Sequence, residues 1–78
     1  MMKKQLTMPR LRPEMTKGVL AAWLKEPGEA FVKGEPIFEV ETDKVVNQIE
    51  ADWDGTMKSQ LVEEGDEVQV GDILAEVE

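Results

Sequence analysis

The sequence repeats itself at a spacing of 37 residues, and this repeat constrains the fold more than any other feature. Residues 18–41 align without a gap on residues 55–78, with eight identities in 24 positions. Average residue usage would give about one or two identities by chance. Two related halves of this size predict a pseudo-symmetric fold in which each half supplies strands to both of two packed sheets.

Glycines punctuate both copies of the repeat at matching places. Gly28 and Gly34 in the first copy align with Gly65 and Gly71 in the second. Glycine adopts positive φ at turns without steric cost, so we expect each of these positions to separate two strands. Short apolar segments bounded by such turns predict an all-β fold, a flattened barrel or sandwich.

The segment 14–26 leaves helix and strand open when read alone, because it contains a run of good helix formers. Its partner in the second copy alternates with period 2, as a strand does. The repeat therefore predicts a strand over residues 17–25. On this strand Leu20, Ala22 and Leu24 would point inward, and Trp23 would be at least partly exposed.

The remaining elements follow from the same reasoning. We expect strands over residues 4–8, 37–41, 45–50, 56–61 and 73–77, with short strands near Phe31 and Val68. A loop is expected over residues 9–16 and a turn over residues 52–55. The expected core comprises Leu6, Met8, Leu20, Leu24, Phe31, Ile37, Val40, Val46, Ile49, Leu61, Val68, Leu74 and Val77.

A short polar segment stands between two apolar runs near the middle of the chain. Residues 36–40 and 45–49 read as strands, and the segment Glu41-Thr42-Asp43-Lys44 joins them, so the pattern predicts a β-hairpin. A lysine at such a tip, Lys44, has its amine free in solvent to react. An isolated turn lysine is ordinarily only a solvated surface residue, so the pattern alone does not assign it a function.

Composition excludes several classes of function. The 78 residues allow one small domain and include no cysteine and no histidine. The chain therefore has no disulfide, no thiol ligand and no imidazole to act as a general base or metal ligand. These absences argue against a hydrolase or metalloenzyme built from this chain alone.

Charge and hydropathy restrict the partners and the compartment. The net charge of −8 argues against binding to nucleic acid or to an anionic membrane, since both reward clustered basic charge. The longest apolar run, Val19–Leu24, is far shorter than the roughly 20 residues that span a bilayer. The start of the chain, Met1–Gln5, lacks the apolar segment of a signal peptide. We therefore expect a soluble intracellular domain.

The chain closely resembles the lipoyl domains of the dihydrolipoamide acyltransferases from 2-oxo acid and acetoin dehydrogenase complexes. The resemblance covers essentially the whole chain, and its specific element is the Asp43-Lys44 pair at the midpoint of the repeat. Met8-Pro9, Met15-Thr16, Gly18 and Trp23-Leu24 are similar to the first strands of that family. The resemblance implies a single domain over residues 1–78, a flattened β-barrel of two four-stranded sheets with quasi-twofold symmetry.

The resemblance also implies a function. Lys44 would carry lipoic acid in amide linkage, which removes the positive charge of the lysine. Glu41, Thr42, Asp43 and Val45 would help other enzymes to recognise the turn, although Asp43 could equally be an ordinary turn residue. The domain would be monomeric, non-catalytic, and cytoplasmic or in the mitochondrial matrix. Its partners would be a thiamine-diphosphate-dependent decarboxylase, an acyltransferase core, dihydrolipoamide dehydrogenase and a lipoate-attaching enzyme.

Two other functions remain open. Biotin carrier domains share this fold, but their attachment lysine lies between two methionines, whereas Lys44 lies between Asp43 and Val45. Met57-Lys58 resembles half of a biotin motif, yet the repeat places it in a strand and not at the hairpin. The third reading is an unmodified β-sandwich interaction module that has kept the fold without the cofactor.

Several further motifs have simple structural interpretations. Asp52–Gly55, with Glu63 downstream, matches a calcium loop poorly, because an EF-hand needs glycine at its sixth position. The acidic segment 63–67 reads as a solvated turn or a contact for a basic partner. Trp23 and Trp53 are expected to pack at the sandwich edge. The loop from Pro9 to Glu14 is locally basic, and Arg12 stands where the family often has a small residue.

Overall fold

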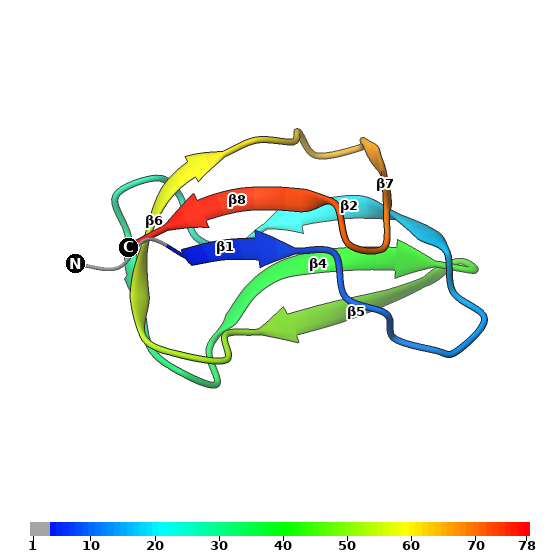
Figure 1. Cartoon of the computed structure of the whole chain (residues 1–78), viewed down its shortest axis with the longest axis horizontal. Helices are drawn as coiled ribbons and strands as arrows, with labels where there is room; N and C mark the ends of the chain where they lie inside the picture. The colour runs from blue at the N-terminus through cyan, green and yellow to red at the C-terminus, as the bar shows by residue number, and fades with distance from the viewer. Residues whose placement is uncertain (1–3) are drawn as a thin grey trace.

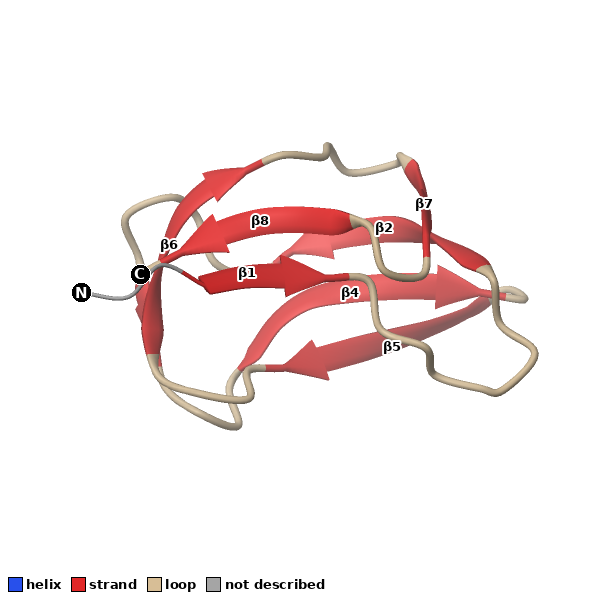
Figure 2. Ribbon diagram, in the orientation of Figure 1, coloured by secondary structure: helices blue, strands red, loops and turns tan. Residues whose placement is uncertain are grey.

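The computed structural model describes residues 4–78, all in strands, turns and loops (Figures 1 and 2). Residues 1–3 lie outside the described part, and so does most of the segment on which the signal-peptide expectation rests. The strands are β1 (Lys4–Thr7), β2 (Lys17–Trp23), β3 (Ala30–Phe31), β4 (Pro36–Thr42), β5 (Val45–Glu50), β6 (Gly55–Gln60), β7 (Glu67–Gln69) and β8 (Ile73–Val77). Residues 4–78 contain no helix long and apolar enough to cross a membrane.

The strands form two four-stranded antiparallel sheets. One sheet has the order β1-β8-β6-β3 and the other has the order β5-β4-β2-β7. Exchanging β1 with β5, β4 with β8, β2 with β6 and β3 with β7 converts one order into the other. The sheets pack into a flattened barrel whose extents are 35 × 21 × 18 Å (Figure 2). The predicted all-β fold with quasi-twofold symmetry is confirmed, and within the ambiguous segment 14–26 the predicted strand 17–25 is present as Lys17–Trp23.

The strand register repeats with the sequence. Leu20 in β2 pairs with Val40 in β4, and 37 residues later Met57 in β6 pairs with Val77 in β8. A bulge follows each of these pairs. The turns also match, since the amide of Gly28 donates to Met57 at 2.8 Å and the amide of Gly65 donates to Leu20 at 2.7 Å. The two halves are therefore alike in hydrogen bonding as well as in sequence.

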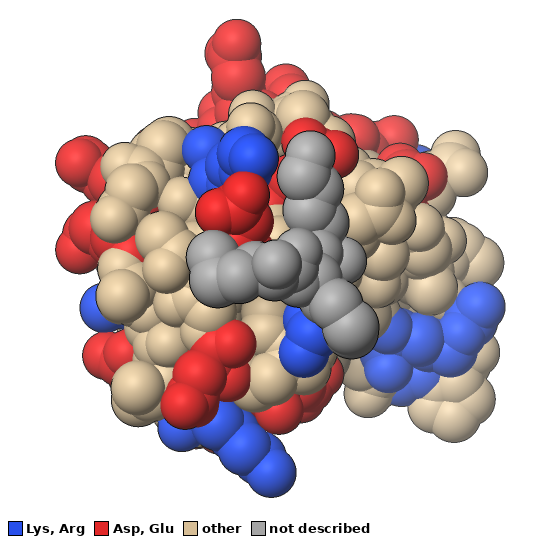
Figure 3. Space-filling model, turned by 60° about the vertical axis from the view of Figure 1, so that its left-hand side comes forward, with Lys and Arg blue, Asp and Glu red and all other residues tan. Residues whose placement is uncertain are grey.

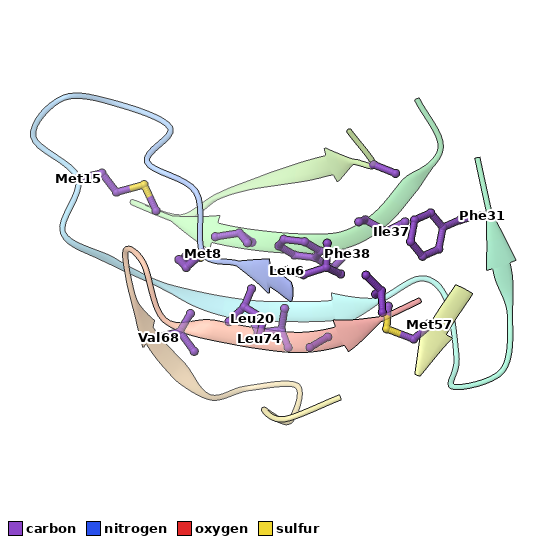
Figure 4. Packing of buried hydrophobic residues seen from close by; sticks show 14 residues of the cluster. Leu6, Met8, Met15, Leu20, Phe31, Ile37, Phe38, Met57, Val68 and Leu74 are labelled. Carbon is purple, nitrogen blue, oxygen red and sulfur yellow. The ribbon is translucent and has the colours of Figure 1, made fainter. Parts of the chain in front are cut away.

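The core lies between the two sheets and extends along the whole barrel (Figure 4). Met15, which belongs to the loop that follows β1, lies at one end, and Phe31 lies near the other end, with Leu20, Phe38 and Leu74 between them. Of the expected core residues, Leu6, Met8, Leu20, Phe31, Ile37, Val40, Val68, Leu74 and Val77 are buried. The core also contains Met15, Phe38, Ala51, Met57 and Ala75, which the prediction omitted.

Two core predictions fail at bulges. Leu24 is 38% exposed and Leu61 is 54% exposed, although both were expected to point inward. A bulge between Leu20 and Ala22 interrupts the alternation of side chains in β2, and a matching bulge interrupts it in β6. Because a one-residue offset turns side chains to the other face, the period-2 extrapolation is wrong beyond each bulge. Trp23 is half-buried, as expected, but it pairs with the buried Phe38 and packs against the core, so the alternation that placed it on the outward face is wrong.

A third core prediction fails in the hairpin. Val46 is 52% exposed, and Ile49 is only half-buried. Val46 pairs with the exposed Glu41, so the two residues share the solvent face of the sheet, because paired residues of antiparallel strands lie on the same face. Ile49 lies opposite the buried Phe38, but it belongs to β5, which is the last strand of its sheet. Edge position explains its incomplete burial.

Candidate cofactor-attachment site

A two-residue turn connects β4 to β5 at one end of the barrel. Thr42 pairs with Val45, which leaves Asp43 and Lys44 as the loop. Their φ angles are 48° and 65°, and they are the only non-glycine residues with positive φ in the described chain. Two consecutive positive φ values are characteristic of a type I′ turn, whose backbone twist matches that of the flanking strands. The predicted hairpin is confirmed, and its tip is Asp43-Lys44.

The lysine occupies a position where glycine would be easier to accommodate. Type I′ turns favour Asn-Gly or Asp-Gly, because left-handed backbone costs a residue with a Cβ about 1–2 kcal/mol. Asp43 fits this preference, whereas Lys44 does not. Strained backbone at a surface turn is an observation that points toward a function for the side chain. The lysine side chain itself is therefore the feature that this turn presents.

The amine of Lys44 is available for reaction. Lys44 is exposed, and none of the carboxylates in residues 4–78 forms an ion pair with it.

The neighbours of Lys44 that were predicted to take part in recognition differ in their solvent exposure. Glu41, Asp43 and Val45 are exposed, and Val45 has 57% of its surface in solvent, whereas Thr42 is buried with 9% exposed. Thr42 therefore supports the turn from beneath and offers little surface for direct contact.

The loop between β1 and β2 folds against this hairpin. Arg12 Nη2 donates a hydrogen bond to Asp43 Oδ2, and Arg12 Nε lies 3.9 Å from Glu14 Oε1. The bond to the Asp43 carboxylate raises the pKa of the Arg12 guanidinium above its ordinary value. The locally basic loop therefore makes a specific contact with the lysine turn, through Arg12 and Asp43.

Depressions on both sides flank the turn. A groove of about 440 Å³ lies between the hairpin and the start of β2, and its lining includes Met15, Gly18 and Lys44. A smaller depression of about 170 Å³ is lined by Leu11, Arg12, Thr42, Val45 and Asn47. Arg12 and Thr42 line both depressions, so Arg12 contributes to the surface on either side of its contact with Asp43.

The other candidate motifs take structural roles. Lys58 lies in β6 and pairs with Glu78 at 2.7 Å, and this contact raises the pKa of the lysine above its ordinary value. Met57-Lys58 is therefore a strand segment, as the repeat predicted. Asp54 Oδ1 accepts a hydrogen bond from the Lys33 amide at 2.8 Å, and the described residues contain no cluster of carboxylates that could hold a metal ion.

The acidic segment and the tryptophans are also part of the scaffold. Glu64 accepts a bond from the Trp23 amide at 2.8 Å, and the Trp23 indole donates to the carbonyl of Val62 at 3.1 Å. The ring of Trp23 packs against Phe38 with their centroids 5.7 Å apart. Trp53 packs against Phe31 at 6.0 Å. Both tryptophans are half-buried at the edge of the core, as predicted.

Comparisons with known proteins agree with this geometry. The pattern of the family described as biotin-requiring enzymes, which covers biotin and lipoyl attachment, matches residues 4–77. A solved lipoyl domain of the 2-oxoglutarate dehydrogenase complex from Azotobacter vinelandii superimposes with a TM-score of 0.77 and is 35% identical. That comparison covers 95% of this chain and 94% of the other. A single-chain long-chain acyl-CoA carboxylase shares the fold at 19% identity, with a TM-score of 0.78 over 96% of this chain and 7% of the carboxylase.

Longer acyltransferases contain a similar segment. The lipoamide acyltransferase component of the branched-chain alpha-keto acid dehydrogenase complex from Bacillus subtilis is 39% identical over 96% of this chain and 18% of its own length. The acetyltransferase component of the acetoin cleaving system from Pseudomonas putida is 39% identical over 92% of this chain and 20% of its own length. The chain thus spans about a fifth of the length of these relatives.

A two-sheet barrel with an exposed lysine on a hairpin at one end of the barrel defines the class of biotinyl and lipoyl carrier domains. The chain belongs to this family. Within the family it is a lipoyl domain, because the solved domain that it matches along nearly its whole length is a lipoyl domain. Lipoyl domains carry lipoic acid covalently on a lysine. The domain is a carrier and not itself a catalyst, and the lipoyl reading is favoured over the biotin alternative.

Proposed function

We propose that Lys44 is the lysine that carries lipoic acid in this chain. The observation that carries the proposal is the position of Lys44 on a two-residue turn, at positive φ, exposed and unpaired among residues 4–78. The lysine amine would displace the activated group from the carboxyl carbon of the cofactor and form an amide. The charged lysine side chain gives up two protons in all, one when it becomes the nucleophilic amine and one when the amide forms, so it loses its positive charge.

The scaffold suits a mobile arm. Bound lipoic acid supplies a disulfide that accepts an acyl group and two electrons and passes them on. The chain contributes a rigid support, since Thr42 and Val45 close the turn and the strands behind it are held in a packed sheet. At the opposite end of the barrel Lys4 pairs with Val77, so the beginning and the end of the described chain lie away from the hairpin (Figure 1). A longer protein could therefore hold the domain at one end and leave the arm free at the other.

We also propose that the domain serves the acyltransferase component of a 2-oxo acid or acetoin dehydrogenase complex. Its partners would then be a thiamine-diphosphate-dependent decarboxylase, the acyltransferase core, dihydrolipoamide dehydrogenase and a lipoate-attaching enzyme. Support comes from the relatives, which are components of such complexes. Some relatives are bacterial and others are mitochondrial, so the compartment would be the bacterial cytoplasm or the mitochondrial matrix.

The test is covalent attachment at a defined lysine. The 78-residue chain is co-expressed with a lipoate-attaching enzyme or with a biotin-attaching enzyme, and its intact mass is measured. We expect one lipoyl adduct on the wild-type chain and on the Lys58→Arg variant, and none on the Lys44→Arg variant. Biotin as the sole adduct, or a lipoyl adduct that survives Lys44→Arg, would contradict the proposal.

A further inference from the structure

The contact between Arg12 and Asp43 joins two segments that are 31 residues apart in the sequence. Arg12 belongs to the loop after β1, and Asp43 is the first of the two positive-φ residues in the lysine turn. Among the ion pairs of residues 4–78, this one alone connects that loop to the hairpin. It therefore places a cation of this chain directly beside the residue that precedes Lys44.

The loop that supplies Arg12 is anchored by its own contacts. Arg10 Nη1 donates to the carbonyls of Pro13 at 3.0 Å and Met15 at 2.7 Å. The Leu11 amide lies 3.2 Å from Met15 Sδ, and the Met15 amide donates to the Arg12 carbonyl at 3.0 Å. Met15 is 5% exposed, and Figure 4 shows it at one end of the core. The loop is therefore partly ordered by its own contacts, and the bond from Arg12 to Asp43 ties it to the hairpin.

From this arrangement we propose that Arg12 is a positioning residue for the acylation of Lys44. By binding the Asp43 side chain it fixes the loop against the turn, and so it sets the surface that a lipoate-attaching enzyme meets around the lysine. This inference rests on the proposed attachment at Lys44. Arg12 acts through Asp43 and need not touch the cofactor.

The charges around the turn give the contact a second consequence. Arg12, Lys17 and Lys44 line the groove beside the turn together with four carboxylates, Glu14, Glu41, Asp43 and Glu67. Lys17 pairs with Glu67 at 3.5 Å, which leaves Arg12 as the cation that neutralises Asp43. Acylation removes the charge of Lys44, so the Arg12–Asp43 and Lys17–Glu67 pairs are the charge pairs of the groove that persist on the modified domain, and of these only the first includes a residue of the lysine turn.

The effect of this pair should be moderate. The Arg12 side chain is 46% exposed and that of Asp43 is 75% exposed, so solvent and salt screen their attraction. An exposed ion pair of this kind changes an equilibrium by about two- to five-fold. We therefore expect an effect on recognition and not on folding.

The kinetic test uses the 78-residue chain as the substrate of a lipoate-attaching enzyme. We expect Arg12→Gln to raise the KM for the chain about two- to five-fold without changing kcat, and Arg12→Lys to restore part of the loss. Lys58→Gln, which removes one positive charge from the Glu78 pair, is the matched control and should leave both constants unchanged. In a double-mutant cycle with Asp43→Asn, the Arg12 effect should disappear once Asp43 is neutral.

A second measurement does not depend on attachment. Amide hydrogen exchange of Leu11 and Met15 should accelerate in Arg12→Gln and stay unchanged in Lys58→Gln, because the loop loses its tie to the hairpin. Equal exchange rates, independent effects in the double-mutant cycle, or faster acylation of Arg12→Gln would each overturn the positioning role. A chain that is never lipoylated but still shows the exchange difference would instead refute the attachment at Lys44.

Discussion

Leu20 and Met57, 37 residues apart, occupy equivalent places in the two halves of the barrel. Each side chain is completely buried, each pairs with a buried valine of the neighbouring strand, and each precedes a bulge. The bulges turn the following residues, so Leu24 and Leu61 at the strand ends face solvent. The equivalence thus extends from the core to the places where alternation fails.

This relationship predicts losses of stability that differ in size at two positions of the same region. Met57→Ala should destabilise the domain by about 2–5 kcal/mol, because it opens a cavity in a packed core. Leu61→Ala should change stability by only about 0.5 kcal/mol, because the side chain is already 54% exposed. Urea denaturation of the two variants measures the difference. Comparable losses would show that Leu61 belongs to the core after all.

Two equivalent glycines should differ in their tolerance of alanine. A Cβ on Gly55 would lie 2.9 Å from the backbone oxygen of Glu78 and 3.1 Å from Phe31, so Gly55→Ala should cost about 1–3 kcal/mol. At Gly18 the nearest atom, at 2.7 Å, is the flexible methyl end of Met8, and the nearest backbone atom, the oxygen of Glu41, lies farther away at 3.2 Å. We therefore expect a smaller loss for Gly18→Ala in thermal denaturation. The opposite order would contradict the close approach at Gly55.

The lysine turn should be more stable without its lysine. Lys44→Gly removes a Cβ from left-handed backbone and should stabilise the hairpin by up to about 1 kcal/mol, while abolishing attachment. Lys44→Arg keeps the same backbone strain, so it should abolish attachment without a gain in stability. Denaturation midpoints of the two variants provide the comparison. A less stable Lys44→Gly variant would show that the turn does not strain Lys44.

Glu35 should make the domain sensitive to acid. A hydrogen bond from the Val32 amide, and then one from Lys25, lower the pKa of Glu35 below its ordinary value of 4.5. Because the folded pKa lies below the unfolded one, the carboxylate stabilises the fold above pH 4.5, and this contribution is lost as the pH falls through the folded value.

The corresponding variant is Glu35→Gln. It should melt at a lower temperature than the wild type at pH 7, and the difference should shrink as the pH falls below about 4.5. Glu50→Gln, which removes the same charge at an exposed position on β5, serves as the matched control. A constant difference between wild type and Glu35→Gln across this range would remove Glu35 as the source of acid sensitivity.

The sequence predicted the architecture well because the repeat carries long-range information. Because residues 56–61 alternate as a strand does, the repeat predicted a strand over residues 17–25 as well, against the helix propensity of that segment. The hairpin at Asp43-Lys44 followed from two apolar runs around a polar tip. The resemblance then selected a lysine that periodicity alone would have left as an ordinary surface residue.

The mistakes arise where tertiary structure overrides a local period. Bulges depend on how neighbouring strands twist and pair. The alternation of apolar and polar residues in the sequence therefore could not predict the exposure of Leu24 and Leu61. Val46 lies on the outer face because the turn has only two residues, which places Val45 opposite Thr42. Met15 was missed because loop residues are normally exposed, and only the folded loop brings it to the core.

The sequence by itself therefore determined the all-β fold, its internal symmetry and the lysine at the midpoint of the repeat. Tertiary structure alone decided the strained backbone at Asp43 and Lys44, the bulges, and the contact of Arg12 with Asp43. The physical reason is the distance along the sequence between the residues that interact. Apolar periodicity is read from neighbouring residues and the repeat from the comparison of two segments of the sequence, whereas the contact of a side chain with another 31 positions away depends on the packing of everything between them.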